Sequence, residues 1–214
     1  KGVAVSPGST SGSLDEEDLL GFMTVTGDAS NGEAAKLHWS FISSPETFDF
    51  LGKDETLTLN YTVQVYDGTD YVDRVVTVTI NGTNDAPVIS VFVGDSAAET
   101  LDETDAALSV DGTLTISDVD LSDTVSASLT GVAVGTGSVL GPLTTSDLLS
   151  YMKVSGTASG GAPGTLSWEF DSKQQAFDFL GAGDKLTLNY TVQIFDGTAY
   201  VDHVVTVTMN GTND

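Results

Sequence analysis

The sequence contains no cysteine, few basic residues and no long apolar run. Without cysteine, neither a disulfide nor a thiolate metal site can form. Seven Lys and Arg residues stand against 31 Asp and Glu residues, so the formal net charge is −24. We therefore expect neither nucleic acid nor an anionic membrane surface as a partner, because their phosphates would repel the chain. No stretch approaches the roughly 18 consecutive apolar residues that a membrane-spanning helix needs, and no signal peptide is visible.

The chain repeats itself at a distance of 129 residues. Residues 57–69 read LTLNYTVQVYDGT and residues 186–198 read LTLNYTVQIFDGT, and residues 75–85 and 204–214 match in the same way. Without a gap, residues 1–85 match residues 130–214 at about 50 of 85 positions. A fixed period of this kind predicts tandem repeats, here of ordinary domain size.

The pattern of each repeat predicts an all-β fold. In residues 57–65 apolar and polar side chains alternate, as in a strand with one buried face. Asp67-Gly68 predicts a turn, and the Gly- and Asn-containing segment 81–87 predicts a linker. We expect tandem β-sandwich domains: an incomplete repeat at 1–85, without its N-terminal strands, and a complete repeat at 86–214.

The complete repeat offers about seven strands and two short helical turns, at 145–151 and 173–180. The expected strands are 88–93, 112–117, 124–134, 153–157, 165–170, 185–195 and 200–209. Trp39, Trp168 and the two FDFLG segments are expected in the cores.

Six positions are acidic in both copies. Six other acids have no acidic counterpart 129 residues on and are expected on solvated surface: Asp15, Glu16, Glu17, Asp28, Glu33 and Glu46. The repeated pairs are Asp18/Asp147, Asp49/Asp178, Glu55/Asp184, Asp67/Asp196, Asp73/Asp202 and Asp85/Asp214. Asp18 and Asp147 lie where a short helix is expected to begin, so we interpret them as helix-start residues.

Strand direction gathers oxygen-bearing side chains at the junction between the repeats. The expected set is Asp54, Glu55, Asn84, Asp85, Asp118, Asp120, Asp123 and Asp196. Ca²⁺ takes six to eight oxygen ligands in flexible geometry, whereas Zn²⁺ would need His or Cys. The set therefore predicts a calcium site. The alternative is that Asn and Asp at strand ends only form turns and caps.

Three segments together resemble the VCBS repeats of large bacterial surface adhesins, many of the RTX type. They are Asp118–Thr124 (DVDLSDT), residues 177–197 and the NGTNDAPV segment at 81–88. The resemblance implies a cadherin-like β-sandwich, neighbouring repeats as partners, calcium binding and secretion to the surface of Gram-negative cells, with a role in adhesion and biofilm. The glycine-rich calcium nonapeptides of RTX proteins are absent.

We do not expect an enzyme. Neither His38 nor His203 is repeated, and the repeated acids fall at domain ends rather than in a cleft. Two functions remain: an extender stiffened by calcium that projects a distal binding tip toward a cell-surface or glycan target, or a repeat that itself recognises a ligand such as a glycan. The ends repeat while the sides differ, HWSFISSPET against SWEFDSKQQA, which favours the extender.

The first copy lacks counterparts of residues 86–129, because Lys1 aligns with Thr130. Three outcomes are open: the chain is a fragment, a neighbour supplies the missing strands by strand donation or homo-association, or an open five-stranded structure persists.

Overall fold

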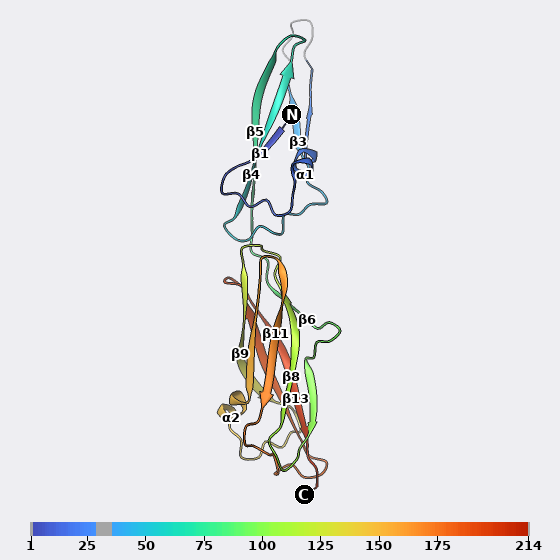
Figure 1. The fold of residues 1–214 in the computed structure, drawn as a ribbon, viewed down its shortest axis with the longest axis vertical. Coiled ribbons are helices and arrows are strands. Elements are labelled where there is room, and N and C mark those ends of the chain that lie inside the picture. Colours follow the sequence, from blue (N-terminus) through green and yellow to red (C-terminus); the bar gives the residue numbers. More distant parts are fainter. Residues whose placement is uncertain (1, 29–35, 214) are drawn as a thin grey trace. The chain divides into compact units, whose positions relative to one another are not determined.

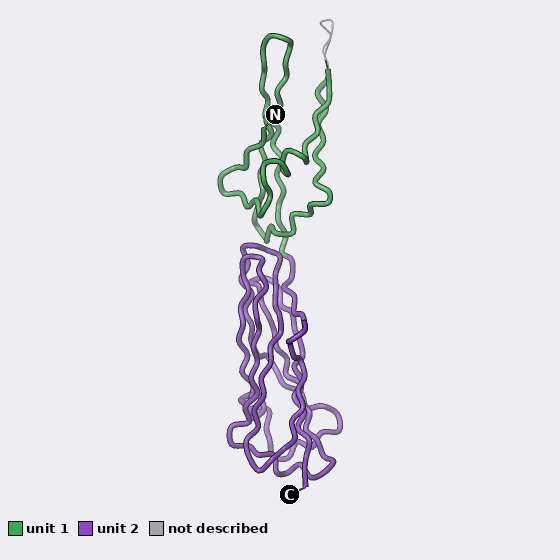
Figure 2. The backbone as a smooth tube through the Cα atoms, turned by 45° about the vertical axis from the view of Figure 1, so that its right-hand side comes forward, with its two compact units in different colours: residues 1–84 green, residues 85–214 purple. Residues whose placement is uncertain are grey.

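A computed structural model describes residues 2–28 and 36–213 of the chain. The chain divides into two compact units, Lys1–Asn84 (unit 1) and Asp85–Asp214 (unit 2) (Figure 2). The division falls one residue before the expected boundary. Strands form most of the regular structure (Figure 1), which confirms the all-β prediction. No helix in the described part is long and apolar enough to span a membrane.

Unit 2 is a β-sandwich built from a single folded sheet. The strand order is β6-β8-β11-β10-β9-β12-β13-β7. Its elements are β6 (Val88–Ser90), β7 (Ala98–Asp102), β8 (Ser109–Ser117), β9 (Thr124–Val134), α2 (Thr145–Ser150), β10 (Met152–Ser159), β11 (Ala162–Asp171), β12 (Lys185–Phe195) and β13 (Tyr200–Asn210). The first residues of β9 pair with β10 and the remainder pairs with β12. This strand therefore joins the two layers.

Unit 2 departs from the expected elements in three places. Strand β7 was not expected; it pairs parallel with β13 at the sheet edge. Strand β6 ends at Ser90 rather than residue 93, because the following residues turn and the amide of Phe92 donates to Asp95 at 3.1 Å. Residues 173–180 form turns instead of a helix: Lys173 and Phe177 have φ near +60°, which a right-handed helix excludes.

Alternating side chains of β11, β12 and β13 form the core of unit 2. Leu188, Tyr190 and Val192 are fully buried, as the alternation predicts. The Tyr190 hydroxyl donates to the Leu148 carbonyl at 2.9 Å, and burial raises the pKa of Tyr190. Trp168 is also buried, and its indole nitrogen donates to a backbone carbonyl of the segment before β7.

The described residues of unit 1 form five strands in two separate sheets, β1-β4-β5 and β2-β3. Its elements are β1 (Gly2–Val5), α1 (Glu16–Gly21), β2 (Met23–Thr26), β3 (His38–Phe41), β4 (Thr56–Tyr66) and β5 (Tyr71–Asn81). The Tyr61 hydroxyl donates to the Leu19 carbonyl at 2.7 Å, just as its counterpart does in unit 2. Trp39, however, is 52% exposed, so the prediction that both tryptophans are core residues is wrong for this one.

Both short helices begin with a capping box, which explains the repeated acids at their starts. Asp18 and Asp147 are the third helical residues, and the carboxylate of each accepts a hydrogen bond from the backbone amide of its N-cap residue. The helix expected at 145–151 is thus present, and these two carboxylates are helix-start residues.

The glycine of the repeated NGTND segment is required by close backbone packing. A Cβ atom on Gly82 would lie 2.3 Å from the Gly52 carbonyl oxygen, and one on Gly211 would lie 2.3 Å from the Gly181 oxygen. The amides of the two glycines donate to the Glu55 and Asp184 carbonyls, both at 2.9 Å. Any side chain here would break this contact between strand end and loop.

The two tryptophans provide a matched test of the packing. Trp168→Ala should lower the free energy of unfolding of unit 2 by about 3–5 kcal/mol, since a fully packed ring is lost. Trp39→Ala should lower that of unit 1 by less than about 1 kcal/mol, since half of the ring already faces solvent. Hydrogen exchange resolved by unit measures both changes. Equal losses would contradict the open arrangement of unit 1.

Candidate metal centre

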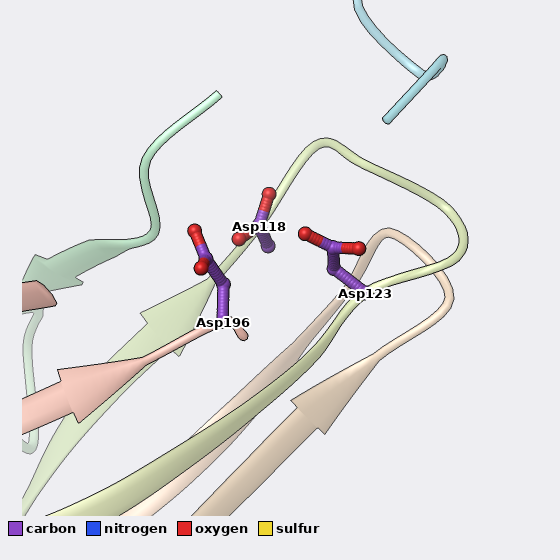
Figure 3. A group of neighbouring side chains, drawn as sticks. All are labelled: Asp118, Asp123 and Asp196. Atoms are coloured by element: carbon purple, nitrogen blue, oxygen red, sulfur yellow. The ribbon is translucent and has the colours of Figure 1, made fainter. Parts of the chain in front are cut away.

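Three aspartates from separate segments converge at one end of unit 2 (Figure 3). Asp118 directly follows β8, Asp123 directly precedes β9, and Asp196 directly follows β12. Each contributes a carboxylate oxygen, and these oxygens lie within 4.8 Å of one another. The convergence follows from topology, because β8 and β12 both end at the edge of the sandwich where β9 begins.

Backbone hydrogen bonds hold the side chain of Asp196 in place. Its Oδ1 atom accepts the amides of Thr198 and Ala199, both at 2.6 Å, within the turn between β12 and β13. Asp196 is 6% exposed. The turn expected from Asp-Gly in the sequence therefore also orients a carboxylate of the cluster.

Asp120 links the cluster to the first residue of unit 2. Its Oδ2 atom accepts the Asp85 amide at 2.9 Å, and its own amide donates to Oδ1 of Asp118 at 3.0 Å. Asp120 is fully buried and Asp118 is 5% exposed. A bound ion at this end would therefore be coupled to the segment that enters unit 2.

Two buried carboxylate oxygens at this end lack a hydrogen-bond partner. They are Oδ2 of Asp118 and Oδ1 of Asp120. Leaving a buried carboxylate oxygen unsatisfied costs free energy, and more so when other carboxylates lie close by. A cation bound at this end would satisfy both oxygens.

The electrostatics of the cluster point in the same direction. Burial, reinforced by the neighbouring carboxylates, raises the pKa of Asp120 to about 6. Burial and the charges of Asp196 and Asp123 also raise the pKa of Asp118. The ionised forms of Asp118 and Asp120 are thus disfavoured unless positive charge is added. Hard oxygen ligands without nitrogen or sulfur suit divalent cations such as Ca²⁺, Mg²⁺ and Mn²⁺.

The structure brings together five of the eight residues expected around the cation. They are Asp85, Asp118, Asp120, Asp123 and Asp196, all in unit 2. The other three, Asp54, Glu55 and Asn84, belong to unit 1.

Within unit 1, Glu55 already has partners. Its Oε2 accepts the Gly52 amide at 2.9 Å and its Oε1 accepts the Thr10 hydroxyl at 2.8 Å. Asp54 occupies a turn with φ of 67°. The shared acidity of Glu55 and Asp184 is thus explained by a loop contact, since Asp184 accepts the Gly181 amide at 3.2 Å in the same way.

Glu103 was not among the expected ligands, although it lies at the other end of unit 2. It is 1% exposed; one carboxylate oxygen accepts the amide and hydroxyl of Thr212, and the other, Oε2, has no partner. Repetition between the two copies does not identify Glu103, because it lies outside residues 130–214, the part of unit 2 that aligns with residues 1–85. Strand direction, which places residues 102–105 at this end, was the available signal.

No protein-family model matches the chain, and no curated protein does. Solved structures with a similar fold include human protocadherin-24 EC1-2, at 12% identity over 90% of this chain and 83% of that one, with a TM-score of 0.34. Zebrafish RET cadherin-like domains 1 to 4 match at 13% identity over 90% and 42%, with a TM-score of 0.31.

A bacterial structure matches with a TM-score in the same range. The sialic acid binding region of a Streptococcus sanguinis adhesin matches at 17% identity over 74% of this chain and 36% of that one, with a TM-score of 0.31. With TM-scores below 0.5, these likenesses identify neither a family nor a ligand for this chain.

Removing one charge from the cluster should stabilise the metal-free protein. In chelator at pH 7, we expect Asp120→Asn to raise the free energy of unfolding of unit 2 by about 1–3 kcal/mol, because an ionised buried carboxylate beside other carboxylates is neutralised. The gain should disappear as pH falls from about 6 to 4, where the wild-type carboxyl is itself protonated in the folded state. Denaturant unfolding across this range measures the effect.

Asp111→Asn is the matched control, since it removes the same charge from an exposed position on β8. It should change the stability by less than about 0.5 kcal/mol. If Asp120→Asn destabilises the metal-free protein, the cluster is not a site of uncompensated charge.

Proposed function

We propose that the chain forms calcium-stiffened extender repeats of a large secreted bacterial surface adhesin and has no catalytic role. The observation that carries this proposal is the convergence of Asp118, Asp123 and Asp196, with partnerless buried oxygens on Asp118 and Asp120. A calcium ion would supply the missing positive charge and coordinate these oxygens, and backbone carbonyls and water would complete the shell.

The repetition supports an extender rather than a single site. Two units of the same sequence type follow one another, and their acids and turn residues repeat at the ends while the sides differ. An array of such units would project a distal adhesive tip toward a cell surface or a glycan. The absence of cysteine and the charge of −24 fit export as an unfolded chain that folds outside a Gram-negative cell, where calcium is abundant.

Calcium should raise the melting temperature of unit 2. With a dissociation constant on the order of 10⁻⁴–10⁻³ M, as in extracellular modules, about 10 mM calcium stabilises the folded state by about 1–3 kcal/mol. Asp118→Asn should remove most of this gain, whereas Asp111→Asn should retain it, since Asp111 is exposed and distant in β8. Calorimetry with calcium and with chelator measures the difference. An equal melting temperature in both would overturn the calcium proposal.

Calcium should also restrict the segment that joins the units, because Asp120 binds the Asp85 amide at its start. We expect small-angle scattering to show a narrower range of particle dimensions with calcium than with chelator, and no such change in Asp118→Asn. If calcium binds but the scattering does not change, the cation stabilises unit 2 without acting as a stiffener.

A recognition role for each unit is the second candidate, and one observation favours it. Aromatic rings stack in pairs at the hairpin end of both units: the exposed Tyr66 and Tyr71 have centroids 4.3 Å apart, and the half-buried Phe195 lies 4.1 Å from the exposed Tyr200. These residues face each other across the strands, so the pairs also close the hairpins. Glycan binding that Tyr71→Ser and Tyr200→Ser abolish would favour recognition over the extender.

A further inference from the structure

Unit 2 shows which surface of unit 1 is unfinished. Three apolar positions of unit 1 are open to solvent: Leu37 is 45% exposed, Trp39 52% and Val65 42%. Their counterparts 129 residues later, Leu166, Trp168 and Ile194, are between 0% and 1% exposed. Apolar side chains at equivalent positions of the two units therefore differ in what covers them.

In unit 2 the cover is β8 together with the first half of β9. Leu166 pairs with Leu114, and Trp168 pairs with Gly112, both of β8. Ile194 pairs with Ala127 of β9. The second half of β9, residues 131–134, has the same register on β12 that β1 has on β4. Unit 1 thus contains the counterpart of the end of β9, and its described residues contain no counterpart of what precedes it.

The place of the absent half-strand is a cleft in unit 1. A cavity of about 300 Å³ lies between the two sheets, lined by Val25, Thr26, Gly27, Leu37, Val63 and Gln64. In unit 2 the counterparts of the last two, Val192 and Gln193, pair with Leu129 and Ser128 of β9. Without this strand, β2-β3 and β1-β4-β5 remain separate sheets.

We infer that unit 1 is an acceptor for strand addition, and that its partner is a polypeptide segment of the repeat type that residues 109–129 supply in unit 2. One strand of this segment pairs with the free edge of β3, and the other inserts between β2 and β4. Backbone hydrogen bonds to the exposed strand edges provide affinity, and alternate side chains filling the cleft provide specificity.

Trp39 sets a steric requirement on the donor. In unit 2 the indole of Trp168 lies so close to β8 that a Cβ atom on Gly112 would be 2.5 Å from its Cζ2 atom. A donor strand therefore needs glycine opposite Trp39, flanked at alternate positions by apolar residues such as Val110 and Leu114. A segment of the repeat type meets this requirement. A hydrophobic strand of unrelated sequence, or the exposed apolar face of a second molecule, need not meet it.

The test supplies the segment directly. A second copy of residues 86–129 is fused ahead of Lys1 in the full chain, so that its last residue continues into β1 as Leu129 continues into the end of β9. We expect the acrylamide quenching of Trp39 to fall several-fold, while Trp168, buried in either case, is unaffected. Amide exchange in residues 37–41 and 63–66 should slow by about tenfold or more.

Two variants of the donated copy are matched. Gly112→Val in that copy should abolish both effects, because the new side chain meets the indole of Trp39. Asp111→Val in that copy adds the same side chain on the exposed face and should preserve them. A synthetic peptide of residues 107–129, added to the unmodified chain, should protect the same amides, which tests the inference even if the fusion protein folds poorly.

Two results would overturn the inference. The first is unchanged quenching and exchange in both the fusion protein and the peptide mixture. The second is an unmodified chain that sediments as a dimer with Trp39 already protected, since a second molecule's open face would then be the occupant. None of these measurements involves a cation, so they stand apart from the calcium proposal.

Discussion

The pairing of β9 with both layers is the constraint on which the sandwich depends. In unit 2 this strand leaves β10 and continues along β12, so one sheet folds over a closed core. The described residues of unit 1 include the counterpart of its second half alone, as β1, and their strands form two separate sheets. Burial of Trp168 depends in addition on β8, whose Gly112 pairs with it, and no counterpart of β8 lies among the described residues of unit 1, where Trp39 is exposed.

The ends of unit 2 carry the polar groups that the fold leaves unsatisfied. Asp118 and Asp120 at one end, and Glu103 at the other, each keep a buried carboxylate oxygen without a partner. In a chain with a net charge of −24, solvated carboxylates repel one another less than buried ones. Buried polar groups without partners are expected at functional sites, and in unit 2 they lie where strands end.

Local patterns in the sequence predicted what depends on neighbouring residues. The alternation at 57–65 and 185–195 gave strands β4 and β12 with their buried faces, and the acidic helix starts at Asp18 and Asp147 became capping boxes. Short elements were harder to predict from the sequence. Strand β7 has only five residues and depends on a parallel edge of β13, and the turns at 173–180 depend on positive φ angles at Lys173 and Phe177. Neither leaves a periodic signal.

By itself the sequence determined the repeat, the all-β class and which acids stand at strand ends, because each rests on spacing along the chain. It also placed Asp118, Asp120, Asp123 and Asp196 in one group through strand direction. Only the tertiary structure decided which oxygens are buried without partners, that Glu55 is occupied within unit 1, and that Trp39 is open while Trp168 is not. These outcomes depend on strands distant in sequence, and burial is a property of the segments that cover a residue rather than of the residue itself.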